Sequence, residues 1–135
     1  MQCLPDSANA PARRGKPVAQ ERPLIGPHHA GELSGLFKML ANDTRLRLLH
    51  ALVRASEMCV TDLAAELEMA PQAISNQLQR LADRRVVASR REGVRLFYHV
   101  TDPCVAGLLD LGLCLLEETT TAPNATPRAR RPARA

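Results

Sequence analysis

Aromatic residues and metal-finger motifs are scarce in this chain of 135 residues. It has no tryptophan, one tyrosine and two phenylalanines, so leucine, valine, isoleucine and alanine must form the core. The four cysteines include no Cys-x-x-Cys pair, which argues against a zinc finger. No apolar run reaches about 18 residues, and no apolar signal core follows the first charges. We therefore expect one small domain in a reducing cytoplasm, with no membrane span.

The net charge of +4 is distributed unevenly. Residues 1–28 carry four basic and two acidic groups and residues 119–135 carry four arginines, whereas the middle has ten basic and twelve acidic groups. Both ends contain prolines and lack apolar periodicity. We expect a flexible arm at 1–28, a folded domain at 29–118 and a flexible basic tail at 119–135.

Two short helical patterns, about three residues apart, lie at the centre of the chain. They are Thr61-Asp-Leu-Ala-Ala-Glu-Leu and Pro71-Gln-Ala-Ile-Ser-Asn-Gln-Leu-Gln-Arg-Leu, an arrangement typical of a helix-turn-helix. Two earlier helices are expected over about 30–41 and, capped by Asn42, to about residue 55. The inward face of the latter is predicted to contain Leu46, Leu49 and Val53.

A hairpin and a last helix complete the expected domain. Residues 86–100 form an expected ribbon with its turn at Glu92-Gly93, in which Leu96, Tyr98 and Val100 alternate with Arg95, Phe97 and His99, as in a half-buried hairpin. Asp102-Pro103 then begins a helix through Glu118 that is apolar around most of its circumference, which requires burial on several sides. The fold class is therefore mainly α with a β-hairpin wing, a winged helix-turn-helix, and the simplest burial of the last helix is against its copy in a homodimer.

The second helix of the central pair and the wing carry candidate DNA contacts. The candidates for base edges are the polar residues Gln72, Ser75, Asn76 and Gln79, because amides pair with adenine and small hydroxyls allow close approach. The candidates for phosphates or the minor groove are Arg80, Arg90, Arg91 and Arg95. A merely solvated polar face is the alternative.

Three motifs resemble the ArsR/SmtB metal-sensing repressors. They are Leu40-Ala-Asn-Asp-Thr-Arg-Leu-Arg-Leu-Leu, Glu57-Met-Cys-Val-Thr-Asp-Leu-Ala and Gln72-Ala-Ile-Ser-Asn-Gln-Leu-Gln-Arg-Leu. The resemblance implies a homodimeric repressor that binds an inverted-repeat operator when empty and releases it on binding a metal ion. Within the family the chain is most similar to the thiol-rich, mercury-responsive members.

The sequence departs from the family's metal-binding patterns. Thr61 stands where two-cysteine versions of the second motif have another thiol. In the last helix Asp102 matches the family's aspartate, whereas Cys104 and Leu115 occupy the two histidine positions. The harder nitrogen and oxygen ligands are thus partly replaced by sulfur.

The thiols Cys59, Cys104 and Cys114 are the candidate metal ligands. Cys104 and Cys114 are ten residues apart, or roughly 15 Å along one helix, whereas two sulfurs on one ion must lie within about 4–5 Å. Two antiparallel last helices could pair Cys104 of one chain with Cys114 of the other, with Cys59 as a third ligand. Sulfur favours soft ions, so we expect Hg(II) first, then Cd(II), Pb(II) or As(III).

Other readings remain open. Cysteine is often only a small buried apolar residue, and a ligandless repressor, or one in which Cys104 and Cys114 oxidise across the dimer, is an alternative. Cys3, in the arm, has no assigned role. No phosphate loop, Ser-His-Asp arrangement or paired catalytic carboxylates is recognisable, so we expect no enzyme and no organic cofactor.

Overall fold

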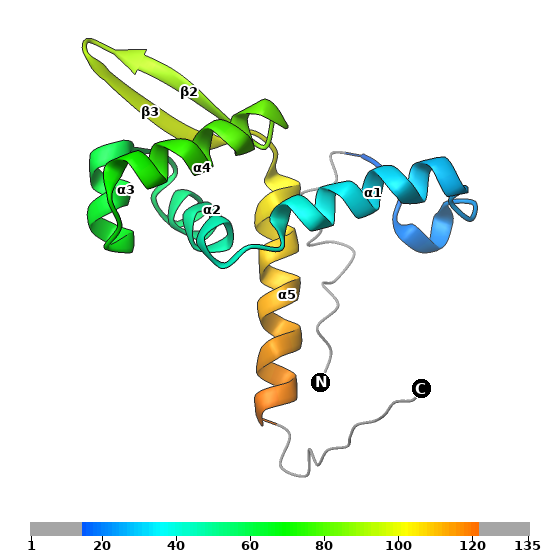
Figure 1. Cartoon of the computed structure of the whole chain (residues 1–135). Helices are drawn as coiled ribbons and strands as arrows, with labels where there is room; N and C mark the ends of the chain where they lie inside the picture. The colour runs from blue at the N-terminus through cyan, green and yellow to red at the C-terminus, as the bar shows by residue number, and fades with distance from the viewer. Residues whose placement is uncertain (1–14, 122–135) are drawn as a thin grey trace.

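The computed structural model describes residues 15–121, with side chains as far as Glu118. The order of elements is a 3-10 helix at Ala19–Glu21, then α1 (Pro27–Leu40), α2 (Asp43–Ala55), β1 (Met58–Cys59), α3 (Val60–Leu67), α4 (Pro71–Asp83), β2 (Val87–Glu92), β3 (Arg95–Val100) and α5 (Pro103–Thr121). The helices α2, α3 and α4 and the hairpin form one compact module, from which α1 and α5 project (Figure 1). The expected winged helix-turn-helix is confirmed. The outer parts of the expected arm and tail, with Cys3, lie outside the described residues.

The core of the module joins α2, α3 and α4. Its fully buried side chains are Leu48, Leu49, Leu52, Leu63, Ile74, Leu78, Leu81 and Val87. Between α3 and α4, Glu68 adopts a left-handed conformation with φ 56° and ψ 50°, and its N–H closes the end of α3 by donating to the carbonyl of Ala65 at 3.3 Å. Pro71 then begins α4 at a position where no intrahelical donor is needed.

The start of α2 matches expectation, but part of its predicted inward face is wrong. Asn42 caps the helix, and its Oδ1 accepts a hydrogen bond from the N–H of Arg45 at 3.1 Å. Leu49 is buried as predicted, whereas Leu46 is 40% exposed and Val53 is only half-buried. The buried stripe is centred on Leu48 and Leu52 instead, because α2 packs against both α3 and β3.

The wing is part of a three-stranded antiparallel sheet in the order β1-β3-β2. The hairpin turn is formed by Gly93, which has a φ of +65°, and Val94, one residue later than predicted, because Glu92 is the last residue of β2 and pairs with Arg95. Further along the strands Arg90 pairs with Phe97. The short strand β1, which the sequence did not predict, pairs Cys59 with Phe97 and Met58 with Tyr98. One row of residues therefore crosses from the wing to the start of the helix-turn-helix.

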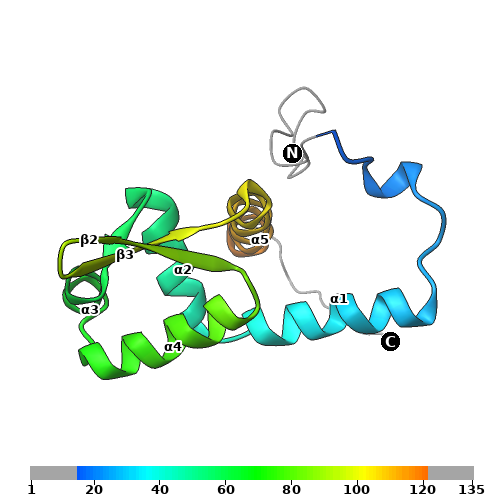
Figure 2. The ribbon, with the colours of Figure 1, turned by 90° about the horizontal axis from the view of Figure 1, so that it is seen from above.

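The helices α1 and α5 leave much of their apolar surface uncovered. α1 begins at Pro27, three residues before its predicted start, and α5 extends to Thr121, beyond the predicted end at Glu118. Seen from above, α1 extends beyond the module on one side, beside α5 (Figure 2). Along these helices Phe37, Leu113, Leu115 and Leu116 are between 42% and 64% exposed. Within residues 15–121 no helix is long and apolar enough to cross a membrane.

Candidate DNA interface and thiol site

The helix α4 has one buried face and one polar face. Ile74, Leu78 and Leu81 are fully buried, while the predicted contacts Gln72, Asn76, Gln79 and Arg80 are exposed and Ser75 is half-buried. Within this face Gln72 Nε2 donates to Asn76 Oδ1 at 3.0 Å, and Gln79 Nε2 donates to Asp83 Oδ1 at 3.0 Å. The amide groups are thus held along the helix surface, spaced by one turn.

A polar link that the sequence did not predict joins α4 to the corner between α1 and α2. Arg45 Nε donates to Gln77 Oε1 at 2.8 Å, and Arg45 Nη1 donates to the carbonyl of Met39 at 2.7 Å. The last turn of a helix leaves its carbonyls without intrahelical partners, and Arg45 supplies one for α1. One guanidinium therefore connects α1, α2 and α4.

The wing arginines have different surroundings. Arg90, Arg91 and Arg95 are all exposed, and the guanidinium carbon of Arg95 lies 5.9 Å from the centre of the Phe97 ring. Arg90 differs in its carboxylate partners: it donates from Nε to both carboxylate oxygens of Glu57, at 3.1 and 3.0 Å, and from Nη1 to Glu92 Oε1 at 3.1 Å. These hydrogen bonds hold the pKa of the Glu57 carboxyl below its ordinary value and raise that of Arg90.

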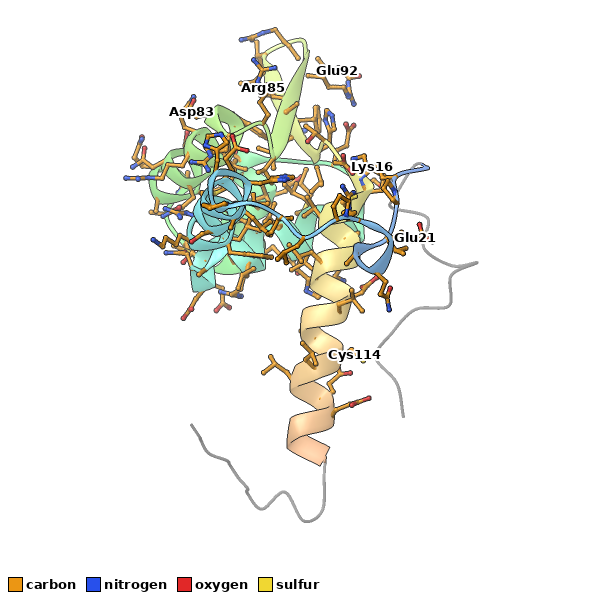
Figure 3. The ribbon with its side chains drawn as sticks, turned by 90° about the vertical axis from the view of Figure 1, so that its right-hand side faces the viewer. Lys16, Glu21, Asp83, Arg85, Glu92 and Cys114 are labelled. Carbon is orange, nitrogen blue, oxygen red and sulfur yellow. The ribbon has the colours of Figure 1, made fainter. Side chains whose placement is uncertain are left out.

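The three candidate thiol positions are on separate parts of the protomer. Cys59 is 4% exposed and directly precedes α3. Cys104 is half-buried in the first turn of α5, and its N–H donates to Asp102 Oδ1 at 2.8 Å. Cys114 lies in the lower half of α5, far below Glu92 of the wing (Figure 3).

One protomer does not assemble a metal site from these residues. Cys104 and Cys114 are ten residues apart on the single helix α5, and a helix rises about 1.5 Å per residue. No group of three His, Cys, Asp or Glu side chains suited to a metal ion occurs within residues 15–121. Cys59 and Cys104 carry thiols, whereas Cys114 is disulfide-bonded.

Two acidic residues were missed by the sequence reasoning. Glu57 could not be found from local spacing, because its partner Arg90 is 33 residues away. Glu118 lies one turn after Cys114, and its Oε2 is buried without a hydrogen-bond partner among the described residues. The i, i+4 spacing places Cys114 and Glu118 on one face of α5.

Comparison with known proteins identifies the family. Residues 42–89 match the model described as "Bacterial regulatory protein, arsR family". The chain is 34% identical to the cadmium resistance transcriptional regulatory protein CadC of Listeria innocua, over 64% of this chain and 72% of that protein. The chain belongs to the arsR family. A probable mercury resistance operon repressor of Streptomyces lividans is 32% identical, over 84% of this chain and 87% of the repressor.

Solved structures agree with this assignment. The antimony-specific transcriptional repressor AntR is 60% identical, with a TM-score of 0.68, over 78% of this chain and 95% of AntR. A homodimeric winged helix-turn-helix DNA-binding domain from Mycobacterium bovis is 27% identical, with a TM-score of 0.62, over 79% of this chain and 97% of that domain. This arsR-family chain is a DNA-binding transcriptional repressor and not an enzyme.

Proposed function

We propose that this arsR-family protein is a homodimeric, metal-responsive repressor that binds an inverted-repeat operator when metal-free and is released when cysteine thiolates bind a soft ion. The observation that carries the proposal is the placement of Cys104 in the first turn of α5 and of Cys114 ten residues further along the same helix, whose apolar surface is largely uncovered. Two such helices running antiparallel bring each Cys104 to the partner's Cys114.

The dimer is supported by apolar surface on α1 and α5. A groove of about 570 Å³ runs between α1, α2 and α5, lined by Phe37, Leu46, Leu108 and Leu113 among others. Leu46, whose exposure was unexpected, is accounted for if a second protomer covers this groove. Exposed apolar patches of this kind typically mark interfaces.

The DNA interface combines α4 with the wing. Two recognition helices related by a dimer axis reach successive major grooves when their half-sites lie about one duplex turn apart. Gln72, Ser75, Asn76 and Gln79 are proposed to contact bases, and the exposed arginines Arg80, Arg91 and Arg95 to contact phosphates.

For the inducer, the proposal names soft, thiophilic ions. The sequence expectation placed Hg(II) first, with Cd(II), Pb(II) and As(III) next. The 60% identity to AntR, a repressor described as antimony-specific, supports placing Sb(III) at the head of this series. Each thiol loses its proton on binding, so the site must be reduced, Cys114 included. Cys59 is a third ligand only if it leaves its buried position.

The test is release of a DNA duplex that wild-type protein selects from a random pool. Release by Sb(III), As(III), Hg(II), Cd(II), Pb(II) and Zn(II) is measured on reduced wild-type protein and on Cys59→Ser, Cys104→Ser and Cys114→Ser. We expect release by the thiophilic ions and loss of response in the Cys104 and Cys114 variants. Release by Zn(II) alone, or full response in all three variants, would contradict the thiol site.

Mixed dimers test whether the site spans two protomers. A dimer of one Cys104→Ser chain and one Cys114→Ser chain keeps one intact Cys104–Cys114 pair if the pair is formed between subunits, and none if it is formed within one. We expect the mixed dimer to bind half the metal of the wild type, while either variant alone binds none. Absence of binding by the mixed dimer would exclude the intersubunit pair.

A redox-responsive repressor, in which Cys104 and Cys114 oxidise across the dimer, is the second candidate. The disulfide bond of Cys114 favours a redox role for this residue, although its partner is not Cys104, which carries a thiol. In that case peroxide, without any metal, releases the duplex, and a dithiol reductant restores binding. We expect metal ions to release the duplex from the reduced protein, and peroxide alone not to release it. Release by peroxide alone would favour the redox mechanism instead.

A further inference from the structure

Arg90 is the most completely engaged charged side chain of the wing. Its guanidinium bonds Glu57 through two nitrogens and Glu92 through a third. The guanidinium carbon also lies 4.9 Å from the centre of the Phe97 ring, within cation–π range. A bidentate arginine–carboxylate pair is geometrically specific and stronger than an ordinary neutral hydrogen bond.

The partners of Arg90 connect the wing to the start of the helix-turn-helix, which α3 and α4 form. Glu57 directly precedes β1, whose Cys59 pairs with Phe97 of β3, and Phe97 pairs in turn with Arg90 of β2. α3 begins at Val60, immediately after β1. The contact from Arg90 to Glu57 therefore spans the sheet and fixes β2, the outermost strand of the wing, to the chain that leads into α3.

The local charge disfavours a phosphate at this point. Glu57 and Glu92 both accept hydrogen bonds from the one guanidinium of Arg90, so its positive charge is already offset by two carboxylates. A DNA phosphate bound by Arg90 would lie beside two carboxylates, or would have to displace them. Arg91 and Arg95 are exposed on the same hairpin.

We propose that Arg90 is a positioning residue of the wing, held by Glu57, and that it does not contact DNA. This replaces the phosphate contact that its place in the sequence predicts. The pair of Arg90 and Glu57 sets the direction of the wing, and hence where Arg91 and Arg95 meet the DNA backbone. This inference rests on the proposed operator binding.

The test is a double-mutant cycle in DNA affinity at several salt concentrations, on the duplex selected by wild-type protein. Glu57→Gln and Arg90→Met should each weaken binding by roughly three- to fivefold, the upper range for a partly exposed pair. The double variant should be no weaker than either single one. The slope of log affinity against log salt should match that of the wild type in all three.

Arg91→Met is the matched control on the next residue of the wing. It should reduce the steepness of the salt dependence by about 0.9, the value for one lost phosphate contact. Arg90→Lys, which keeps the charge without the bidentate geometry, should behave like Arg90→Met, and circular dichroism establishes that each variant is folded. A lysine variant that binds like wild type would contradict the positioning role.

The opposite result is equally clear. Arg90→Met could reduce the slope of log affinity against log salt as much as Arg91→Met does, while Glu57→Gln tightens binding. In that case Arg90 contacts a DNA phosphate, and Glu57 competes with the phosphate for Arg90. If the wild-type protein selects no duplex at all, the proposed operator binding is contradicted instead. Failure of the proposed function can therefore be distinguished from failure of the positioning role of Arg90.

Discussion

Arg45 and Gln77 are joined by a 2.8 Å hydrogen bond between α2 and α4, and the same guanidinium bonds the carbonyl of Met39 in α1. The contact is half-buried at both ends. It ties α4, the helix proposed to contact bases, to the corner between α1 and α2. α1 is in turn proposed to meet the partner protomer.

Loss of this link should lower stability. Arg45→Met leaves the Gln77 amide and the Met39 carbonyl without their partner, so we expect the free energy of unfolding to fall by about 1–3 kcal/mol, as for unsatisfied polar groups. Urea denaturation followed by circular dichroism measures it. The control is Arg47→Met in the same helix, because Arg47 makes only a 3.4 Å contact with the carbonyl of Leu67. Equal losses at both positions would show that the link to α4 adds no stability.

The two proposed kinds of DNA contact should be separable. Gln72→Ala should relax base preference at one position of each half-site with little change in salt dependence, because it removes a base contact. Arg91→Ala should weaken binding on every sequence alike and flatten the salt dependence. Binding to a panel of single-base variants of the selected duplex measures both effects. Identical profiles for the two variants would refute the assignment.

The proposed dimer interface predicts an effect on mass in solution. Leu113→Glu places a carboxylate in the apolar groove beside α5, and burying an unpaired charge is costly. Light scattering should give twice 14.8 kDa for wild type and 14.8 kDa for the variant. Val94→Glu is the control, since Val94 is apolar and 94% exposed at the wing tip, and it should remain dimeric. A monomeric wild type, or a dimeric Leu113→Glu, would contradict the interface.

The turn of the helix-turn-helix offers a conformational test at Glu68. Its left-handed backbone is readily adopted by glycine but not by β-branched residues. We expect Glu68→Val to lower the free energy of unfolding by about 1–2 kcal/mol and Glu68→Gly to preserve or raise it. At Glu66, exposed inside α3, the order should reverse, because glycine is the poorer helix former. The same ranking at both sites would show that backbone conformation is not the cause.

The elements that sequence could predict are those set by local patterns. The cap at Asn42 and the proline start of α4 depend on neighbours within a few positions, and both are as predicted. The hairpin turn was predicted one residue too early, because Glu92 still pairs with Arg95 and the turn is formed by Gly93 and Val94. β1 was missed because a two-residue strand has no alternation to detect and exists only through pairing with β3.

The misassigned residues depend on distant partners. Leu46 lies on the apolar side of α2, yet other helices decide which leucines are covered, so its exposure could not be seen in the helix alone. The environment of Arg90 is set by Glu57 from outside the hairpin. Charge density along the chain identified the wing as basic but could not separate Arg90 from Arg91.

The pairing of Tyr98 with Met58 has a practical consequence. This is the single tyrosine of a chain without tryptophan, so its ultraviolet emission is not masked by a brighter fluorophore. It lies on β3 where the wing meets β1, one residue beyond Phe97, against which Arg90 stacks. The unmodified protein thus contains its own optical probe at this junction, and titrations with a metal ion can be followed at that one place without attaching a dye.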